Sequence, residues 1–271
     1  LCVALFATAA AHADEDYEAG LAAYEAGDHD TARELWSLSA AVGNAQAATG
    51  LGELYLTGSG FEADPVQAAV WFRQAAEQDE PRALHLLGIL HAEGQGVPRD
   101  EERAAGLLAR AVEAGEIDAN YALGVLLEEG RGVPANAAEA ARHYQVAAEA
   151  GNSAAQYALA ALYIAGQGVS QDYERAAALF LAAGEAGDTN AQVGLARLYR
   201  AGLGVPKDEV EAARWYRRAA LQGDGDAQRE LRELTPDAQA AARDEAAPPV
   251  QRPAAPTAGT PGTVDATRPA E

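Results

Sequence analysis

The sequence predicts an all-α fold, an α-solenoid built as a right-handed superhelix of helix-turn-helix repeats. One observation is a Gly-x-Gly motif that occurs five times at a fixed spacing of 36 residues, without insertion or deletion. Another is that leucines three residues apart recur in the same register, and leucines at this spacing share one face of a helix. A fixed period of roughly 20–50 residues is typical of arrays in which each unit is too small to bury its own apolar face and stacks on its neighbours.

The first segment is the uncharged run LCVALFATAAAHA, which is too short to span a bilayer and ends in a small-residue pattern typical of secretory cleavage sites. We therefore expect a signal peptide fragment over 1–13, cleavage after Ala13, and a periplasmic or secreted protein. A retained anchor is the alternative. Lipid attachment is disfavoured, because Cys2 directly follows Leu1 whereas lipoprotein processing needs a leucine three places before the cysteine.

Residues 14–44 predict an N-terminal capping repeat with a short loop between its two helices. Five residues separate Gly27 from Ala32, whereas ten separate the corresponding Gly58 and Ala68 of the next unit. The residues that resemble those of a tetratricopeptide unit are Gly20, Tyr24, Gly27, Asp28, Ala32 and Trp36. Arrays need polar end units, so we expect this helix pair to close the array.

Five units of 36 residues follow, at 45–80, 81–116, 117–152, 153–188 and 189–224. Each begins with an amphipathic helix that ends at the two glycines, because glycine tolerates the left-handed backbone of a helix C-terminus. A short loop then brings an Asp or Asn whose side chain can accept from the free N–H groups of a second helix. The predicted N-cap residues are Asp64, Asp100, Asn136, Asp172 and Asp208. The second helix closes near a third glycine, which the first unit replaces with Asp79.

The C-terminal part predicts a charged capping helix over 225–234 and then a disordered tail over 235–271. The tail holds seven of the twelve prolines, is rich in Ala and Thr, and has neither a helical nor a strand period. A solubilising terminus is the favoured interpretation, with a flexible tether or a partner-binding segment as the alternatives.

The five units resemble the Sel-one-like repeat (SLR) family, a relative of the tetratricopeptide repeats. The first unit reads AQAATGLGELYLTGSGFEADPVQAAVWFRQAAEQ and the last NAQVGLARLYRAGLGVPKDEVEAARWYRRAALQGD, so the resemblance covers 45–224. It implies a scaffold that binds proteins; exported bacterial relatives include regulators that bind sensor kinases, components of polysaccharide export and secreted host-interacting proteins. A secreted SLR branch carries cysteine pairs, and the predicted mature chain has none.

The net charge of −21 limits the classes of partner. A polyanionic surface repels phosphate backbones and anionic lipids, so we expect no nucleic acid partner and no direct membrane insertion. A protein or peptide partner, basic or neutral, fits better. Solubility alone is the simpler explanation of the charge. The oligomeric state stays open.

No residue pattern predicts catalysis, a metal or a cofactor. His85 and His91 lie six residues apart on different helix faces, without a zinc-binding motif. The serines are few and none lies in a hydrolase motif, and the Gly-x-Gly copies lack the third glycine of a dinucleotide fingerprint. The sequence therefore predicts a protein that is not an enzyme.

The candidate partner-binding surface is the concave groove. In tetratricopeptide arrays the first helix of each unit lines this groove, and the same geometry, carried over by register, selects thirteen candidate residues. They are Gln46, Thr49, Glu53, Arg82, His85, Asp118, Tyr121, Glu128, Glu129, Tyr157, Asn190, Arg197 and Arg200. Tyrosines among charges are typical of interaction hot spots, and an ordinary solvated face is the alternative for each residue.

These observations predict an exported, non-enzymatic scaffold that grips a protein or peptide in its groove. One alternative is a structural component of an envelope assembly such as polysaccharide export, in which the proline-rich tail crosses a gap. A weaker one is a cell-wall or β-lactam hydrolase, since some cysteine-rich relatives are linked to that chemistry.

Overall fold

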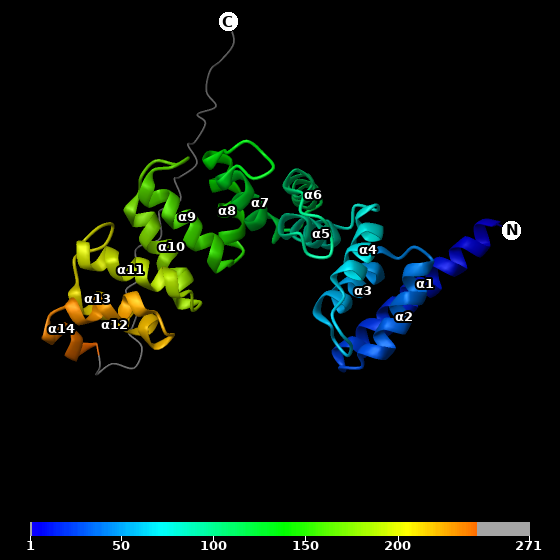
Figure 1. Ribbon diagram of the computed structural model, residues 1–271, viewed down its shortest axis with the longest axis horizontal. Helices are drawn as coiled ribbons and strands as arrows, with labels where there is room; N and C mark the ends of the chain where they lie inside the picture. Colours follow the sequence, from blue (N-terminus) through cyan, green and yellow to red (C-terminus); the bar gives the residue numbers. More distant parts are fainter. Residues whose placement is uncertain (1, 243–271) are drawn as a thin grey trace, which may run out of the picture.

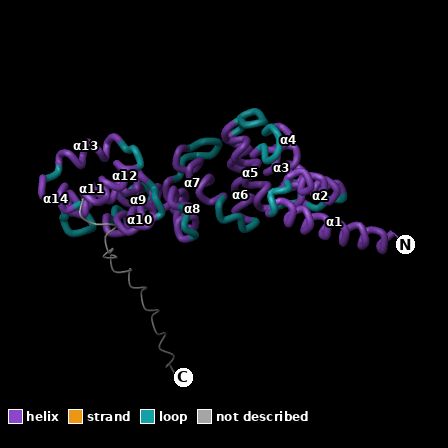
Figure 2. The backbone as a smooth tube through the Cα atoms, turned by 90° about the horizontal axis from the view of Figure 1, so that it is seen from below, coloured by secondary structure: helices purple, strands orange, loops and turns teal. Residues whose placement is uncertain are grey.

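The computed structural model describes residues 2–242 and confirms the predicted all-α solenoid (Figure 1). The helices follow one another in chain order along the long axis, from α1 at one end to α14 at the other; consecutive helices pack together as far as α13, and α14 packs on α12. In the perpendicular view, helices alternate with loops and no strand is drawn in the part described (Figure 2). No helix among the described residues combines the length and apolar character needed to cross a membrane.

Each 36-residue unit contributes two helices. The first helices are α3 (Ala45–Thr57), α5 (Pro81–Glu93), α7 (Ala119–Glu129), α9 (Ser153–Ala165) and α11 (Thr189–Ala201). The second helices are α4 (Pro65–Ala76), α6 (Glu101–Glu113), α8 (Ala137–Glu149), α10 (Tyr173–Glu185) and α12 (Glu209–Leu221). Every first helix ends at a left-handed glycine, and every second helix begins at the predicted Asp or Asn, whose side chain accepts from the first-turn backbone.

The second glycine of the motif has its own physical reason. At Gly132, where φ is +70°, an added Cβ would lie 2.1 Å from the carbonyl oxygen of Glu101 in the preceding unit. Gly96, Gly168 and Gly204 stand equally close to the backbone of the units before them. In the second to fifth units the loop therefore crosses the start of the preceding second helix so closely that only glycine fits, and there the Gly-x-Gly motif holds neighbouring units together.

The core runs continuously along the array. The leucine pair of each first helix is buried, as are the aromatic rings of most second helices, among them Phe72, Tyr144, Phe180 and Tyr216. Burial of these side chains against the next unit supplies the main stabilisation, because a chain with a single cysteine cannot form an internal disulfide.

The N-terminal cap consists of α1 (Cys2–Glu25) and α2 (His29–Ala41). Trp36 is buried between them and donates its indole N–H to the carbonyl of Tyr17 at 3.1 Å. Helix α1 continues through the predicted cleavage position: Ala13 is buried, and its carbonyl accepts from Ser39 Oγ at 2.6 Å. No structural boundary therefore separates 1–13 from 14–44 in the described residues.

The C-terminal cap is longer than predicted. Helix α13 (Gly225–Glu233) lies within the predicted 225–234, but α14 (Pro236–Ala241) forms where the disordered tail was expected to start. Ala238 and Ala242 are each 2% exposed, and Arg217 Nη1 donates to the carbonyl of Ala242 at 3.0 Å. The prediction was wrong for 235–242 because proline at the first position of a helix starts it rather than breaking it. Residues 243–271, the rest of the predicted tail, lie outside the described residues.

Candidate partner-binding surface

The thirteen predicted residues separate into groups once their contacts are known. Thr49 does not belong to a surface at all: it is 4% exposed, and its hydroxyl donates to Glu80 Oε2 at 2.8 Å. Glu80 in turn accepts from the backbone N–H of Ala83 and so caps α5. Thr49 therefore stabilises the junction between the first two units, and its assignment to the groove was wrong.

At the N-terminal side of the array, Glu53 and Arg82 form an ion pair between α3 and α5. The hydrogen bond to Glu53 raises the pKa of Arg82 above its usual range. Gln46 is exposed nearby on α3. The two charges largely neutralise each other, so this part of the surface offers little net charge to a partner.

At the C-terminal side, one of the two predicted arginines is already paired with the C-terminal cap. Arg200 pairs with Glu230, and its second guanidinium nitrogen lies 3.5 Å from Glu233, both on α13. Arg197 and Asn190 are exposed on α11. The sequence placed Arg200 in the groove by register, but its charge is already balanced inside the chain.

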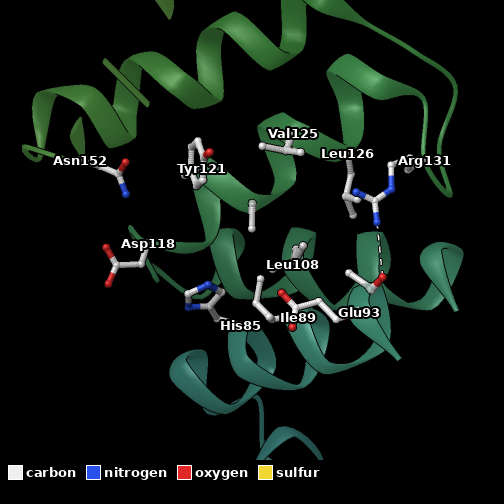
Figure 3. A pocket seen from close by; sticks show the side chains of 12 residues that line it. His85, Ile89, Glu93, Leu108, Asp118, Tyr121, Val125, Leu126, Arg131 and Asn152 are labelled. Atoms are coloured by element: carbon white, nitrogen blue, oxygen red, sulfur yellow. Dashed lines mark hydrogen bonds between the residues drawn. The ribbon is translucent and has the colours of Figure 1, made fainter. Parts of the chain in front are cut away.

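The middle of the array holds a cavity of about 540 Å³ between α5 and α7, called here the α5–α7 pocket (Figure 3). Three of the predicted residues, His85, Asp118 and Tyr121, come together in its wall. Its apolar lining includes Ile89, Leu108, Val125 and Leu126, and its polar lining also includes Glu93, Arg131 and Asn152.

Sequence reasoning missed Ile89 and Val125, although a signal was present. These residues share one register position with Glu53, Ala161 and Arg197, so the position is charged in the first and last units and carries a larger apolar side chain only in the second and third. A comparison of surface positions unit by unit would have found this change. It is informative because both side chains are only partly buried and line a cavity.

Tyr121 is the aromatic residue of the pocket. Its ring packs on Tyr144 with 5.9 Å between centroids, and Tyr144 donates its hydroxyl to Glu128 Oε2 at 2.7 Å. Burial raises the pKa of Tyr121, and the negative charges of Asp188, Glu128 and Glu129 raise it further. The phenol is therefore neutral and sits in a negative field. Tyr157 repeats this packing one unit later, on Phe180.

His85 contributes a neutral imidazole to the pocket. Burial lowers its pKa, an effect that Glu116 and Asp118 partly offset. Its Nδ1 is buried and makes no hydrogen bond with the described residues.

Of the described charged side chains around the pocket, the arginine is paired and two carboxylates are not. Arg131 forms ion pairs with Glu101 at 2.8 Å and with Glu129 at 3.0 Å. In contrast, neither Asp118 nor Glu93 makes a hydrogen bond or an ion pair within the part of the chain that the structure describes. The pocket therefore has two available carboxylates and a guanidinium that is already paired twice.

Helix α7 begins two residues later in its unit than the other first helices. Asp118 precedes it in α-helical backbone conformation and makes no capping hydrogen bond, whereas the residues before α3, α5, α9 and α11 all cap their helices. The register position of those caps holds Glu116 here. Ile117 is left 50% exposed, so the second junction is the irregular one.

The described residues include no group of three or more His, Cys, Asp or Glu side chains arranged to hold a metal ion. The arrangement found in the α5–α7 pocket is suited to binding, with an apolar lining and polar groups at its edges.

Comparison with known proteins gives two kinds of match. The Sel1 repeat model matches at 45–80, 81–116, 117–152, 153–188 and 189–224. Among solved structures, a protective antigen of uropathogenic Escherichia coli strains with an SLR fold is 31% identical, with a TM-score of 0.75 over 85% of this chain. A Sel1 repeat protein from Oxalobacter formigenes is also 31% identical, with a TM-score of 0.71 over 84% of this chain and 97% of its own length.

This chain spans 52% of the length of the E. coli antigen structure. Among curated proteins, none matches the sequence. The family model and the two structures agree on the same repeat architecture. The chain therefore belongs to the Sel1 repeat family, whose members are generally non-enzymatic scaffolds for protein–protein interaction.

Proposed function

We propose that this protein is an exported scaffold that binds a protein or peptide partner in its groove, with the α5–α7 pocket as the centre of the contact. The main support for this proposal is that partly buried apolar side chains, a tyrosine and unpaired carboxylates line one cavity between two units. Pockets of about 300–1,000 Å³ with an apolar lining and a few polar groups are the usual form of binding sites. Tyrosine is among the residues enriched at the energetic centres of interfaces.

Site-specific photo-crosslinking in the native cell tests the proposal. A photoreactive amino acid is placed at Asp118, exposed on the pocket rim, and at Tyr121 inside the pocket. The matched control is Val146, which is 45% exposed on the second helix α8. We expect one protein to be captured from the pocket positions and not from Val146. Equal capture at all three positions, or none at the pocket, would contradict the proposal.

Export is part of the same proposal and rests on the predicted cleavage after Ala13. The support is the small-residue pattern before Asp14 together with the acidic residues that follow it. Cleavage there removes a carbonyl that accepts from the buried Ser39 hydroxyl, so the processed cap has to satisfy Ser39 differently. Intact mass and N-terminal sequencing of the protein from fractionated cells test this step: an N-terminus at Asp14 in an extracytoplasmic fraction supports it, and an uncut chain refutes it.

A further inference from the structure

We propose that the α5–α7 pocket receives one bulky apolar side chain from a peptide segment of the partner, and that lysine or arginine residues flank this side chain. The inference rests on the proposed scaffold function and specifies the chemistry of its ligand. Three features of the same junction support it: the apolar lining, the charge balance of the rim and the irregular start of α7.

The lining selects an apolar group. Ile89 and Val125 lie on facing helices, and Leu108 and Leu126 complete the apolar part of the wall (Figure 3). Leu108 and Leu126 are buried, whereas Ile89 and Val125 are partly open to the cavity. Covering them with an aromatic or large aliphatic side chain removes apolar surface from water, which is the main favourable contribution in most associations. A small or charged side chain would not achieve this.

The rim selects cations beside that apolar group. Asp118 lies at one end of the pocket, and Glu93 lies nearer the end marked by Arg131 (Figure 3). Neither carboxylate is paired within the described residues, whereas Arg131 is held by Glu101 and Glu129. An acidic ligand would therefore meet two free carboxylates and no free cation. A basic residue on either side of the apolar anchor finds an available partner.

The wider field acts in the same direction. Charges that act on Tyr121 come from Asp188, Glu128 and Glu129, all of them negative. Asp188 is two units of sequence away from α5, so the negative field extends along the array beyond the pocket itself. Complementary charge of this kind increases the association rate and the specificity more than the affinity.

The irregular start of α7 explains why the Asp118 carboxylate is available here. Because Asp118 does not cap its helix, its carboxylate is not occupied by backbone N–H groups, unlike Asn152 and Asp188 at the following junctions. The same irregularity leaves Ile117 half-exposed beside Asp118. Departures from regular capping are expected at functional sites, where binding rather than stability determines the residues.

A peptide selection on the full chain tests the inference. A displayed library of random nine-residue peptides is selected on the protein at low salt, and the enriched peptides are labelled and measured by fluorescence polarisation. We expect an aromatic or large aliphatic residue next to Lys or Arg in most enriched peptides. The Glu93→Gln/Asp118→Asn variant should weaken their binding about three- to tenfold at low salt and less at high salt.

Two further variants make the result specific. Glu113→Gln/Glu185→Gln removes the same number of charges from exposed positions on second helices and should leave the affinity unchanged. Val125→Glu places a charge in the lining and should reduce binding at least about tenfold, which is the effect of about 1.4 kcal/mol. Thermal melts of each variant identify any loss of fold. The two amide variants change exposed side chains, so they remain informative if Val125→Glu does not fold.

Several results would overturn the inference: no enriched peptide, enrichment of acidic peptides, or enriched peptides whose affinity is the same for wild type and both pocket variants. These results are distinguishable from failure of the scaffold proposal. If crosslinking from Asp118 captures a partner but the selected peptides ignore the pocket variants, only the ligand chemistry is wrong. If crosslinking also captures nothing, the scaffold proposal fails as well.

Discussion

The middle and the C-terminal end of the array use the same register positions for different purposes. In the second and third units, Ile89 and Val125 line a cavity, and the neighbouring Asp118 and Glu93 have no partner among the described residues. In the fifth unit, Arg197 occupies the position of Val125, and Arg200 is paired with glutamates of the cap helix α13. A register predicts which residues face the groove, and only the contacts show which of them have no partner within the chain.

The difference follows from the position of each unit in the array. An internal unit stacks on a neighbouring unit at both ends, and these two interfaces supply most of its stability. The last unit has no further repeat to cover its apolar end, and the cap helices α13 and α14 cover it instead. Ala227, Leu234 and Ala238 pack against the core, and ion pairs form at the edge. Arg200 near the cap therefore serves the closure, whereas Asp118 and Glu93 in the middle have no partner among the described residues.

The largest effect is expected from core truncation in the middle unit. Leu123 is 6% exposed, and Leu123→Ala should lower the free energy of unfolding by about 2–5 kcal/mol, through lost apolar burial and the cavity left behind. Chemical denaturation measures the loss. Leu195→Ala at the same register position of the last unit is the matched variant.

We expect the two leucine variants to differ in where they loosen the protein. Because stability in an array is nearest-neighbour in character, Leu195→Ala should increase hydrogen exchange mainly in α11–α14, and Leu123→Ala should increase it on both sides of α7. Unchanged melting of Leu123→Ala would show that the register is wrong, and identical exchange patterns would remove the distinction between middle and end.

The next effect concerns contact between units through the loops. Gly132→Ala places a Cβ 2.1 Å from the carbonyl oxygen of Glu101 at a φ of +70°, so we expect a loss of more than about 1 kcal/mol. Gly106 lies inside α6 with no atom within 4 Å of an added Cβ. Gly106→Ala should therefore stabilise the protein by about 0.5–1 kcal/mol, through helix propensity alone.

Paired thermal and urea denaturation of the two glycine variants gives the signs directly. Opposite signs would support the close loop crossing at the second junction. A neutral Gly132→Ala would mean that neighbouring units are held together without it, and the Gly-x-Gly motif would then reflect only the helix end.

The sequence predicts the features that every unit shares. It does not predict contacts that occur at one junction only. The helix ends, the N-caps and the leucine rows follow from local chemistry and the 36-residue period, and the structure has them where the period predicts, except at the start of α7. Three other features depend on contacts specific to one junction: the hydrogen bond between Thr49 and Glu80, the ion pair of Arg200 with α13, and the helix that begins at Pro236. The pocket is intermediate, because His85, Asp118 and Tyr121 were predicted while Ile89 and Val125 were missed.

A smaller effect is expected from the charges at the C-terminal end. Glu230→Gln removes the nearest carboxylate from Arg200, and partly exposed pairs of this kind contribute no more than about 1 kcal/mol. The stability should therefore change little, while the groove near the cap becomes more positive. A basic peptide selected on the wild type should bind the variant with at most a slightly lower association rate, since the pocket lies three units away. A large loss of affinity would show that middle and end form one binding surface.

The last prediction uses pH, because histidine distinguishes the two regions. His85, His91 and His143 lie in the second and third units, and burial lowers the pKa of each below the usual value of about 6.5; no histidine lies in the fourth or fifth unit. A histidine with a lowered folded-state pKa binds its proton more readily when unfolded. The middle units should therefore lose stability as the pH falls through the region below about 7 and regain it as the pH rises.

His91→Tyr tests this prediction most sharply. His91 is 5% exposed, burial is the largest cause of its lowered pKa, and the same register position holds Tyr55, Tyr163 and Tyr199 in other units. The substitution should reduce the loss of stability between about pH 7 and pH 5, since tyrosine does not titrate there. Hydrogen exchange at both pH values should place the remaining difference in α5–α8. An unchanged pH dependence in His91→Tyr would show that His91 does not cause the loss, and a change spread equally over α3–α12 in hydrogen exchange would assign it to carboxylates of both regions, so that pH no longer separates the middle of the array from its end.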